Sequence, residues 1–275
     1  MNIVKDHCTK FKRYGEARSQ QLDSVQVHSI GTAQNTAKAV RDSMDQYNPG
    51  GIVHAVVDAE TEGLVLELLP DENVAWADAG YGNQHSYTFE IAESDYMKYQ
   101  AGSASYVITD EKKFLEDIRR GYRNAVEFAA YKCAQLGIHP MTKLSNGIYA
   151  LYSHDEGRLA GVSSAHVDPT HVWVKIGKTM DDFRREVAAA MDGQGSEEPE
   201  KPETSYVVQA GAFAQKANAQ RLVDALKKAG FDAIIKESEG RYLVQAGVFT
   251  VRANAQRLVE SLKEAGFEAF SYGIS

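Results

Sequence analysis

Cysteine is scarce in this sequence, because the 275 residues include only Cys8 and Cys133. Two thiols exclude a disulfide framework and a four-thiolate metal site, although they leave one pairing open. No run approaches the ~18 consecutive apolar residues of a transmembrane helix, which excludes a membrane span. The first fifteen residues are polar and mixed in charge, without the apolar core of a signal peptide, which argues against Sec export.

Positive charge is also in short supply. The chain has 30 basic and 38 acidic residues, a net charge of −8, and a pI near 5.5, which argues against a nucleic-acid partner. Its 43% hydrophobic and 25% charged residues are typical of a globular protein that buries a core, and the length fits about two domains. With so few thiols, any bound metal must be held mostly by His and Asp.

A stretch without large apolar residues divides the chain. Asp192 to Ser205 contains two Gly, two Pro and four Glu, a composition typical of a flexible linker. We therefore predict one domain over residues 1–191, a linker over 192–205 and a second domain over 206–275. Residues 1–192 carry 20 Lys and Arg against 27 Asp and Glu, a net charge of −7, whereas the part after the linker carries +2.

The C-terminal part contains an internal repeat with an offset of 36 residues. VQAGAFAQKANAQRLVDALKKAGF (208–231) returns as VQAGVFTVRANAQRLVESLKEAGF (244–267). Each copy has a β-prone start, a helical pattern that stops at Gly230 or Gly266, and a second β-prone segment. The repeat predicts a small α+β domain with the order βαββαβ, in which two helices cover one face of a sheet.

The N-terminal part reads as mixed α/β architecture. Short apolar runs predict strands over 24–30, 52–58, 64–69 and 88–92, and helical periodicity predicts helices over 33–44, 112–136 and 180–191. The order and direction of the strands stay open at this point.

Several His residues stand where a functional group is expected. His28 ends an apolar run just before Gly31, His154 lies in a polar segment read as a loop, and His166, Asp168 and His171 share the heptapeptide 165–171. A catalytic zinc site uses three protein ligands and an open position, which two His and one carboxylate satisfy. No HExxH or CxxC spacing is present, so unconnected loop His residues are the alternative.

Residues 20–190 resemble the type 2 N-acetylmuramoyl-L-alanine amidases, a zinc-dependent, peptidoglycan-recognition-protein-like family that includes many phage endolysins. The resemblance implies an α/β fold with a mixed central sheet flanked by helices. The matching segments are VQVHSIG (25–31), GGIVHAVVD (50–58), VAWA (74–77), Gly82-Asn83, TFEIAES (88–94) and SHDEGRLAGVSSAHVDPTHVWVKIGKTMDDFR (153–184).

Position by position, the resemblance implies zinc ligands at His28, His154 and Asp168. Glu90 takes the place of an acidic residue that orients or deprotonates the zinc-bound water. His166 takes the place of a residue that assists catalysis.

Other positions receive weaker predictions. His54 and Trp76 are candidate substrate-binding residues, with packing inside the fold as the alternative for each. Some relatives carry a catalytic Tyr immediately before the position of His54, where this chain has Val53, and this departure places more weight on Glu90. His171 either orients Asp168 or is a surface residue.

Residues 206–272 resemble the SPOR domain, a peptidoglycan-binding module that favours glycan strands stripped of stem peptides. Gln209 and Tyr242 match a glutamine and an aromatic residue of that family and are the candidate glycan-binding residues. A purely structural role in the strands is the alternative. Ala212 stands where the family usually has Ser, which removes one expected hydrogen bond.

Together these features predict a peptidoglycan hydrolase, an endolysin or autolysin, that cleaves the amide between N-acetylmuramic acid and L-alanine and is anchored to the cell wall by its SPOR domain. The predicted cofactor is Zn²⁺, and the predicted partners are peptidoglycan and denuded glycan strands. We expect a protein made in the cytoplasm that acts after release. The alternatives are a non-catalytic peptidoglycan-binding protein and a division-associated factor.

Overall fold

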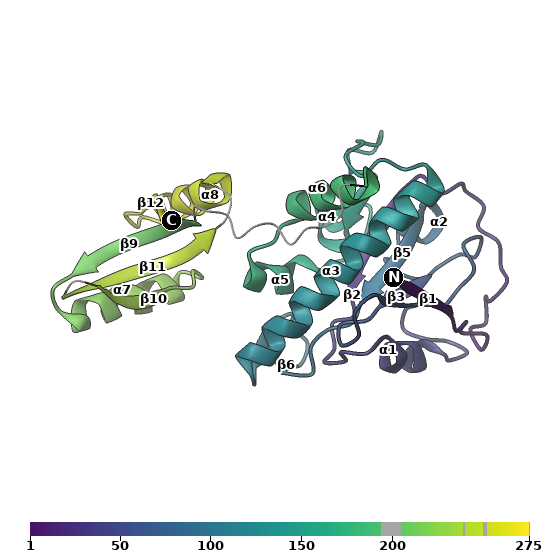
Figure 1. The fold of residues 1–275 in the computed structure, drawn as a ribbon, viewed down its shortest axis with the longest axis horizontal. Helices are drawn as coiled ribbons and strands as arrows, with labels where there is room; N and C mark the ends of the chain where they lie inside the picture. Colours follow the sequence, from purple (N-terminus) through teal and green to yellow (C-terminus); the bar gives the residue numbers. More distant parts are fainter. Residues whose placement is uncertain (194–204, 239, 250–251, 275) are drawn as a thin grey trace. The chain divides into compact units, whose positions relative to one another are not determined.

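The computed structural model describes residues 1–193, 205–238, 240–249 and 252–274, and the chain divides into two compact units, Met1–Ser196 and Glu197–Ser275 (Figure 1). The division falls inside the predicted linker, which lies outside the described residues except for Asp192, Gly193 and Ser205. Within the described part of the chain, no helix is both long enough and apolar enough to cross a lipid bilayer.

The N-terminal unit is built on a mixed six-stranded sheet. Neighbouring strands run parallel except β3 and β4, which pair antiparallel. The edge strands β1 and β8, only four and three residues long, were not predicted. The strands lie in the order β1 (Asn2–Lys5), β4 (Leu64–Glu67), β3 (Ala55–Val57), β5 (Ser86–Ile91), β2 (Ser24–Ser29) and β8 (Leu151–Ser153).

Helices cover both faces of this sheet. The long helix α3 (Glu111–Leu136) crosses it together with α6 (Met180–Met191), and both pack on an apolar cluster that includes Val25 and Val27 of β2 (Figure 1). Helix α1 (Ala37–Met44) belongs to a separate cluster on the other face. Because side chains alternate along a strand, β2 directs Gln26 and His28 away from α3 and toward the α1 side.

The remaining elements of this unit are short. They are α2 (Gly82–His85), the hairpin β6 (Met97–Tyr99) and β7 (Tyr106–Ile108), α4 (His154–Leu159), α5 (Thr170–Trp173) and the 3₁₀ helix η1 (Val174–Ile176). Helix α1 begins four residues later than predicted, because the Thr36 side chain accepts a hydrogen bond from the Ala39 amide and caps it there. Cys8 and Cys133 are both free and buried in the apolar clusters of opposite faces.

The C-terminal unit has the predicted order βαββαβ. Its antiparallel sheet has the strand order β10 (Ile234–Ser238), β11 (Arg241–Phe249), β9 (Ser205–Phe213) and β12 (Phe270–Ile274). Helices α7 (Lys216–Lys228) and α8 (Arg252–Glu264) contribute to one apolar cluster with Val208 and Val244, so both cover the same face. The register of β9 and β11 shifts around Gln245, as at a β-bulge.

Candidate active site

A cleft of about 890 Å³ opens where the parallel strands β2 and β5 end. Carboxyl ends of parallel strands meet at one edge of a sheet, which gathers residues from distant parts of the sequence. The walls are formed by the end of α1, residues 49–53, Trp76 and Ala77, and residues 100–104 between β6 and β7. The predicted ligands and catalytic residues all line this cleft: His28, Glu90, His154, His166 and Asp168.

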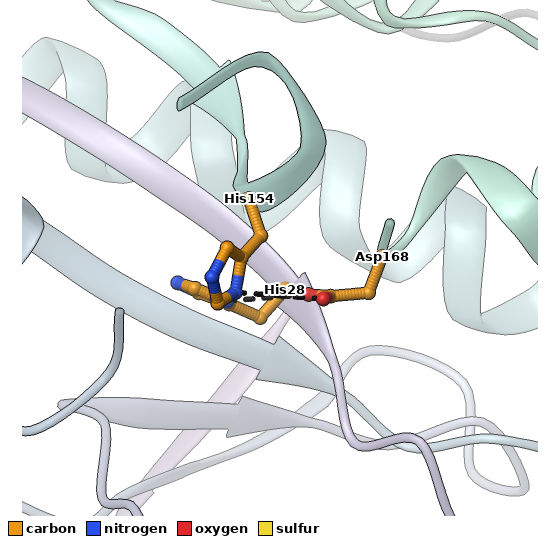
Figure 2. A group of neighbouring side chains, drawn as sticks. All are labelled: His28, His154 and Asp168. Carbon is orange, nitrogen blue, oxygen red and sulfur yellow. Dashed lines mark hydrogen bonds and ion pairs between the residues drawn. The ribbon is translucent and has the colours of Figure 1, made fainter. Parts of the chain in front are cut away.

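Three of these side chains converge (Figure 2). His28 comes from the end of β2, and its Nδ1 atom lies 3.0 Å from Nδ1 of His154 and 3.2 Å from Oδ2 of Asp168. His154 Nδ1 lies 3.4 Å from Oδ1 of Asp168. The expectation of a loop at His154 was wrong: the residue follows β8 directly and opens α4, which Ser153 and Glu156 begin with reciprocal capping hydrogen bonds.

The spacing of these donor atoms fits a small divalent cation. Four-coordinate zinc has bonds of about 2.0–2.1 Å, which places neighbouring ligand atoms ~3.3 Å apart. The separations of 3.0, 3.2 and 3.4 Å are close to that figure, with His28 nearest to Oδ2 of Asp168 and His154 nearest to Oδ1. With one atom taken from each residue, the three donors lie within 4.8 Å of one another. Two imidazole nitrogens and a carboxylate, with the carboxylate side chain only 13% exposed, form a donor set that zinc prefers.

The protonation states of His154 and Asp168 suit metal ligands, whereas His28 would have to release a proton to bind a metal. Burial and the neighbouring His28 lower the pKa of His154 to about 4, so its imidazole is neutral at pH 7, as metal binding requires. Burial acts against both members of the His28–Asp168 pair. Their contact nevertheless raises the pKa of His28 and lowers the pKa of Asp168. The Ser29 amide adds a hydrogen bond of 3.2 Å to Asp168 Oδ2.

Glu90 stands beside the three candidate ligands. It is the register partner of His28 across β2 and β5, so both side chains lie on the same face of the sheet. Its Oε2 atom is buried and has no hydrogen-bond partner within the described ranges. Burial raises the pKa of Glu90, His28 opposes the shift, and Asp168 adds to it. The carboxyl group is therefore held where it exchanges a proton near neutral pH.

His166 is exposed to the cleft, and its ring meets that of His154 edge to face, with the centroids 4.8 Å apart. Ser164 joins the two rings. Its Oγ atom lies 3.0 Å from Nε2 of His154 and 3.5 Å from Nδ1 of His166. Ser164 was not predicted as a site residue, because nothing in the sequence shows that its loop folds back onto the start of α4.

The loop that carries Ser164 and His166 is tied to Asp78. Ser163 donates a hydrogen bond of 2.7 Å from its hydroxyl to Oδ2 of Asp78, and the Ser164 amide donates one of 2.8 Å to the Asp78 carbonyl oxygen. The Gly82 amide and Gln26 Nε2 also donate to Oδ2 of Asp78. Through its carboxylate and its carbonyl oxygen, the buried Asp78 therefore holds Ser163 and Ser164 close to the sheet.

His171 belongs to a second polar group in the cleft. The Tyr99 hydroxyl donates a hydrogen bond of 2.7 Å to Oε2 of the buried Glu93, and His171 Nε2 lies 2.7 Å from the same hydroxyl. Tyr106 donates to the His171 carbonyl oxygen at 3.3 Å. Burial raises the pKa of Glu93 to about 7. His171 is therefore not a loose surface residue, and its contacts in the described part of the chain are with Tyr99, Tyr106 and Glu93, so that it joins the β6–β7 hairpin to the segment after Asp168. An orienting role toward Asp168 stays a prediction.

The structure corrects the expectation for His54. Its side chain is fully buried, stacks on Tyr87 and does not line the cleft, so it does not contact substrate there. The Thr88 amide donates to its Nδ1, and its Nε2 lies 3.0 Å from the Asn73 carbonyl oxygen. Trp76 does line the cleft, half-buried, with Lys12 Nζ 4.6 Å from its ring centroid.

In the C-terminal unit the structure separates the two candidate glycan-binding residues. Tyr242 packs with the apolar cluster beneath the helices, which corrects its assignment as a glycan contact. Gln209 lies on the face opposite the helices, here called the open face, but it is only 8% exposed, and the Tyr272 hydroxyl donates to its Oε1 at 3.3 Å. Its register partner is Gln245, which occupies the same position in the second repeat and was not predicted, although the 36-residue offset indicates it.

Comparisons with known proteins agree with this architecture. The family model described as N-acetylmuramoyl-L-alanine amidase matches residues 18–171, and the SPOR domain model matches residues 202–272. No curated protein matches the chain.

Among solved structures, the Staphylococcus aureus hydrolase AmiA in complex with its ligand is 18% identical, with a TM-score of 0.53, and the match covers 71% of this chain and 87% of that one. The peptidoglycan-binding domain of the Bacillus subtilis cell wall lytic enzyme CwlC is 42% identical over 26% of this chain and 91% of its own, with a TM-score of 0.25. A mutant endolysin from Bacillus subtilis is 16% identical over 68% of this chain and 99% of its own, with a TM-score of 0.46.

The likeness to AmiA shows a shared fold for the N-terminal unit. The amidase model spans more than half of the chain and contains every candidate ligand together with Glu90 and His166. The chain therefore belongs to the N-acetylmuramoyl-L-alanine amidase family of peptidoglycan hydrolases and carries a SPOR domain at its C-terminal end.

Proposed function

We propose that the N-terminal unit hydrolyses the amide between N-acetylmuramic acid and the L-alanine of the stem peptide, with a zinc ion held by His28, His154 and Asp168. The observation that carries this proposal is the convergence of one donor atom from each of three side chains, all within 4.8 Å of one another, in a cleft that Glu90 and His166 also line.

An amide is a poor electrophile, so the reaction needs charge stabilisation and a strong nucleophile. A bound zinc ion would polarise the carbonyl oxygen and bring the pKa of a coordinated water to about 7. Glu90 then accepts the proton of the attacking water on its buried, unpartnered Oε2 atom. His166 donates a hydrogen bond to the carbonyl oxygen as negative charge develops there. Val53 stands where some relatives have a catalytic Tyr and offers no hydroxyl, so Glu90 passes the proton it has accepted to the L-alanine nitrogen as the carbon–nitrogen bond breaks.

We propose the same domain limits as the composition suggests: catalytic domain 1–191, acidic linker 192–205 and wall-binding domain 206–275. Tethering raises the concentration of the catalytic unit at its polymer without any new catalytic contact. Glycan on the open face of the SPOR sheet would contact Phe270, which is 52% exposed, and would have to reach Gln209 and Gln245, which are 8% and 6% exposed. Hydrolysis removes stem peptides and so creates the denuded strands that such a domain prefers.

Mass spectrometry of the soluble products from purified sacculi tests the proposed reaction. We expect stem peptides with a free L-alanine amino terminus, which disappear when a chelator is added and return with zinc. Matched sacculi treated with Asp168→Ala protein serve as the control. Intact sacculi in the presence of zinc would refute the proposed reaction.

The denuded-strand preference has its own test. Full-length Glu90→Gln protein is mixed with intact sacculi and with sacculi stripped of stem peptides, and the pelleted fraction is compared. We expect more protein to pellet with the stripped sacculi. Equal pelleting would contradict the preference but not the amidase reaction. If sacculi stay intact while the wild type pellets with them, the protein is a peptidoglycan-binding or division-associated factor.

A further inference from the structure

The Ser164 hydroxyl lies within hydrogen-bonding distance of both His154 and His166. Its Oγ atom lies 3.0 Å from Nε2 of His154 and 3.5 Å from Nδ1 of His166. One imidazole belongs to the candidate metal site and the other to the candidate catalytic pair. The Ser164 hydroxyl can therefore determine which ring nitrogen carries the proton in both His154 and His166.

The direction of the hydrogen bonds follows from the site itself. Nδ1 of His154 faces Nδ1 of His28 and the Asp168 carboxylate, so this is the atom that would offer a lone pair to the metal. The proton of a neutral His154 then sits on Nε2 and is donated to Ser164 Oγ. The hydroxyl proton is left to point elsewhere, and Nδ1 of His166 is the acceptor within reach.

We propose that Ser164 is a positioning residue that sets the tautomers of His154 and His166 together. An Nδ1 atom that accepts from Ser164 leaves the proton of neutral His166 on Nε2, the donor that the proposed role of His166 requires. This inference rests on the proposed zinc site and on the proposed role of His166. It adds a link between them, because the hydrogen bond that prepares the ligand also prepares the catalytic donor.

The surroundings hold Ser164 in place for this task. The Ser164 amide donates to the Asp78 carbonyl oxygen at 2.8 Å, and the His166 amide donates to the Ser164 carbonyl oxygen at 3.0 Å. His28 has no equivalent support, because its buried Nε2 atom has no hydrogen-bond partner among the residues the structure describes. Outer contacts of this kind orient a ligand and typically change metal affinity by about 10–100-fold. We therefore expect the zinc affinity of the site to depend on the hydrogen bond between Ser164 and His154.

The test compares three full-length variants with the wild type. Ser164→Ala removes the hydroxyl, and Ser164→Thr keeps it. Ser43→Ala is the matched control: it removes a hydroxyl outside this loop, which donates to the Val40 carbonyl oxygen at 2.7 Å. Zinc affinity is measured by competition with a chromogenic chelator. The tautomers of His154 and His166 are read from two-bond ¹H–¹⁵N correlation spectra at pH 7.5, with and without zinc.

We expect Ser164→Ala to bind zinc at least ~10-fold more weakly and to leave His166 as a mixture of tautomers. Ser164→Thr and Ser43→Ala should keep wild-type zinc affinity within about threefold and the Nε2–H form of both rings. Unchanged zinc affinity and unchanged tautomers in Ser164→Ala overturn the inference. If the wild type takes up no zinc, the proposed cofactor fails, while the metal-free spectra still decide whether Ser164 sets the two tautomers.

Discussion

The turn before α2 leaves no room for a side chain at Gly80, and a single methyl group there should disable the site. A Cβ atom at this position would lie 2.0 Å from the carbonyl oxygen of Val162 and 2.9 Å from its carbonyl carbon. Both are backbone atoms, so no change of side-chain rotamer can relieve the clash. The loop at Val162 must therefore move away by about 1.4 Å, from 2.0 to 3.4 Å, before an ordinary contact is restored.

The segment that Gly80→Ala would displace continues directly into the part of the chain that positions the imidazoles. Val162 precedes Ser163 and Ser164, and His166 follows two residues later. A misplacement of about 1 Å costs on the order of 100-fold in rate, whereas one overpacked site typically costs ~1–3 kcal/mol of stability. We expect Gly80→Ala to reduce kcat/KM by about 100-fold and to lower the free energy of unfolding by only ~1–3 kcal/mol.

Dye release from labelled peptidoglycan gives the rate, and urea unfolding of the same preparation gives the stability. Gly50→Ala is the control, because a Cβ atom added at this glycine of the cleft wall has no neighbour within 4 Å. Gly80→Ala protein with more than a third of wild-type activity would refute the reasoning about the loop. A loss of stability above ~5 kcal/mol would also refute it, because the strain would then not be local.

Three further predictions concern the site and its support. Glu90→Gln should bind zinc as the wild type does but lose about 10²–10⁴-fold in turnover, as expected for the loss of a general base. Calorimetry measures the zinc affinity and dye release measures the turnover. Activity within tenfold of the wild type would argue against that role. Zinc at a thousandfold excess over its Kd should stabilise the fold by about 4 kcal/mol and raise the Tm of the catalytic unit by roughly 8–16 °C, measured by thermal unfolding with and without chelator; a Tm independent of zinc would contradict the three-ligand site. Burial and Arg18 lower the pKa of His54 to about 4, below its ordinary 6.5. Its contribution to stability is therefore complete above pH 6.5 and is lost as the pH falls toward 4, by up to about 3 kcal/mol, because the unfolded chain binds the proton more tightly. Urea unfolding across this range should show a flatter dependence for His54→Gln, and an unchanged slope would count against a buried neutral imidazole.

Much of the site was predictable because it uses the ends of regular elements. The apolar run before His28 and the glycine after it indicate a strand that stops at the sheet edge, and the structure places His28 there. The position of His154 was misread because α4 has only six residues, too few for a helical period to be recognised. Its capping pair, Ser153 and Glu156, was the available signal.

The errors in the C-terminal unit have a different cause. Tyr242 and Val244 are two residues apart in one strand, so they share a face, and Val244 is fully buried under the helices. Alternation alone therefore places Tyr242 in the core and Gln245 on the open face. Contacts made by loops cannot be predicted from such a periodicity. Nothing in the sequence indicates that Ser164 contacts His154, because that contact depends on the hydrogen bonds by which Asp78 holds the loop.

The pairing of Gln209 with Gln245 has a consequence for the direction of a bound polymer. The repeat makes β9 and β11 near equivalents that run antiparallel, so half a turn about an axis between them exchanges the two amides. A glycan strand has two chemically distinct ends, yet it would meet the same pair of amides whichever way it lay. The central strands differ on this face at Val207 and Leu243, and the outer strands differ more, with Phe270 and Tyr272 beside Gln209, and Ile234 and Lys236 on the side of Gln245. Polarity of binding would therefore depend mainly on the margins of the sheet.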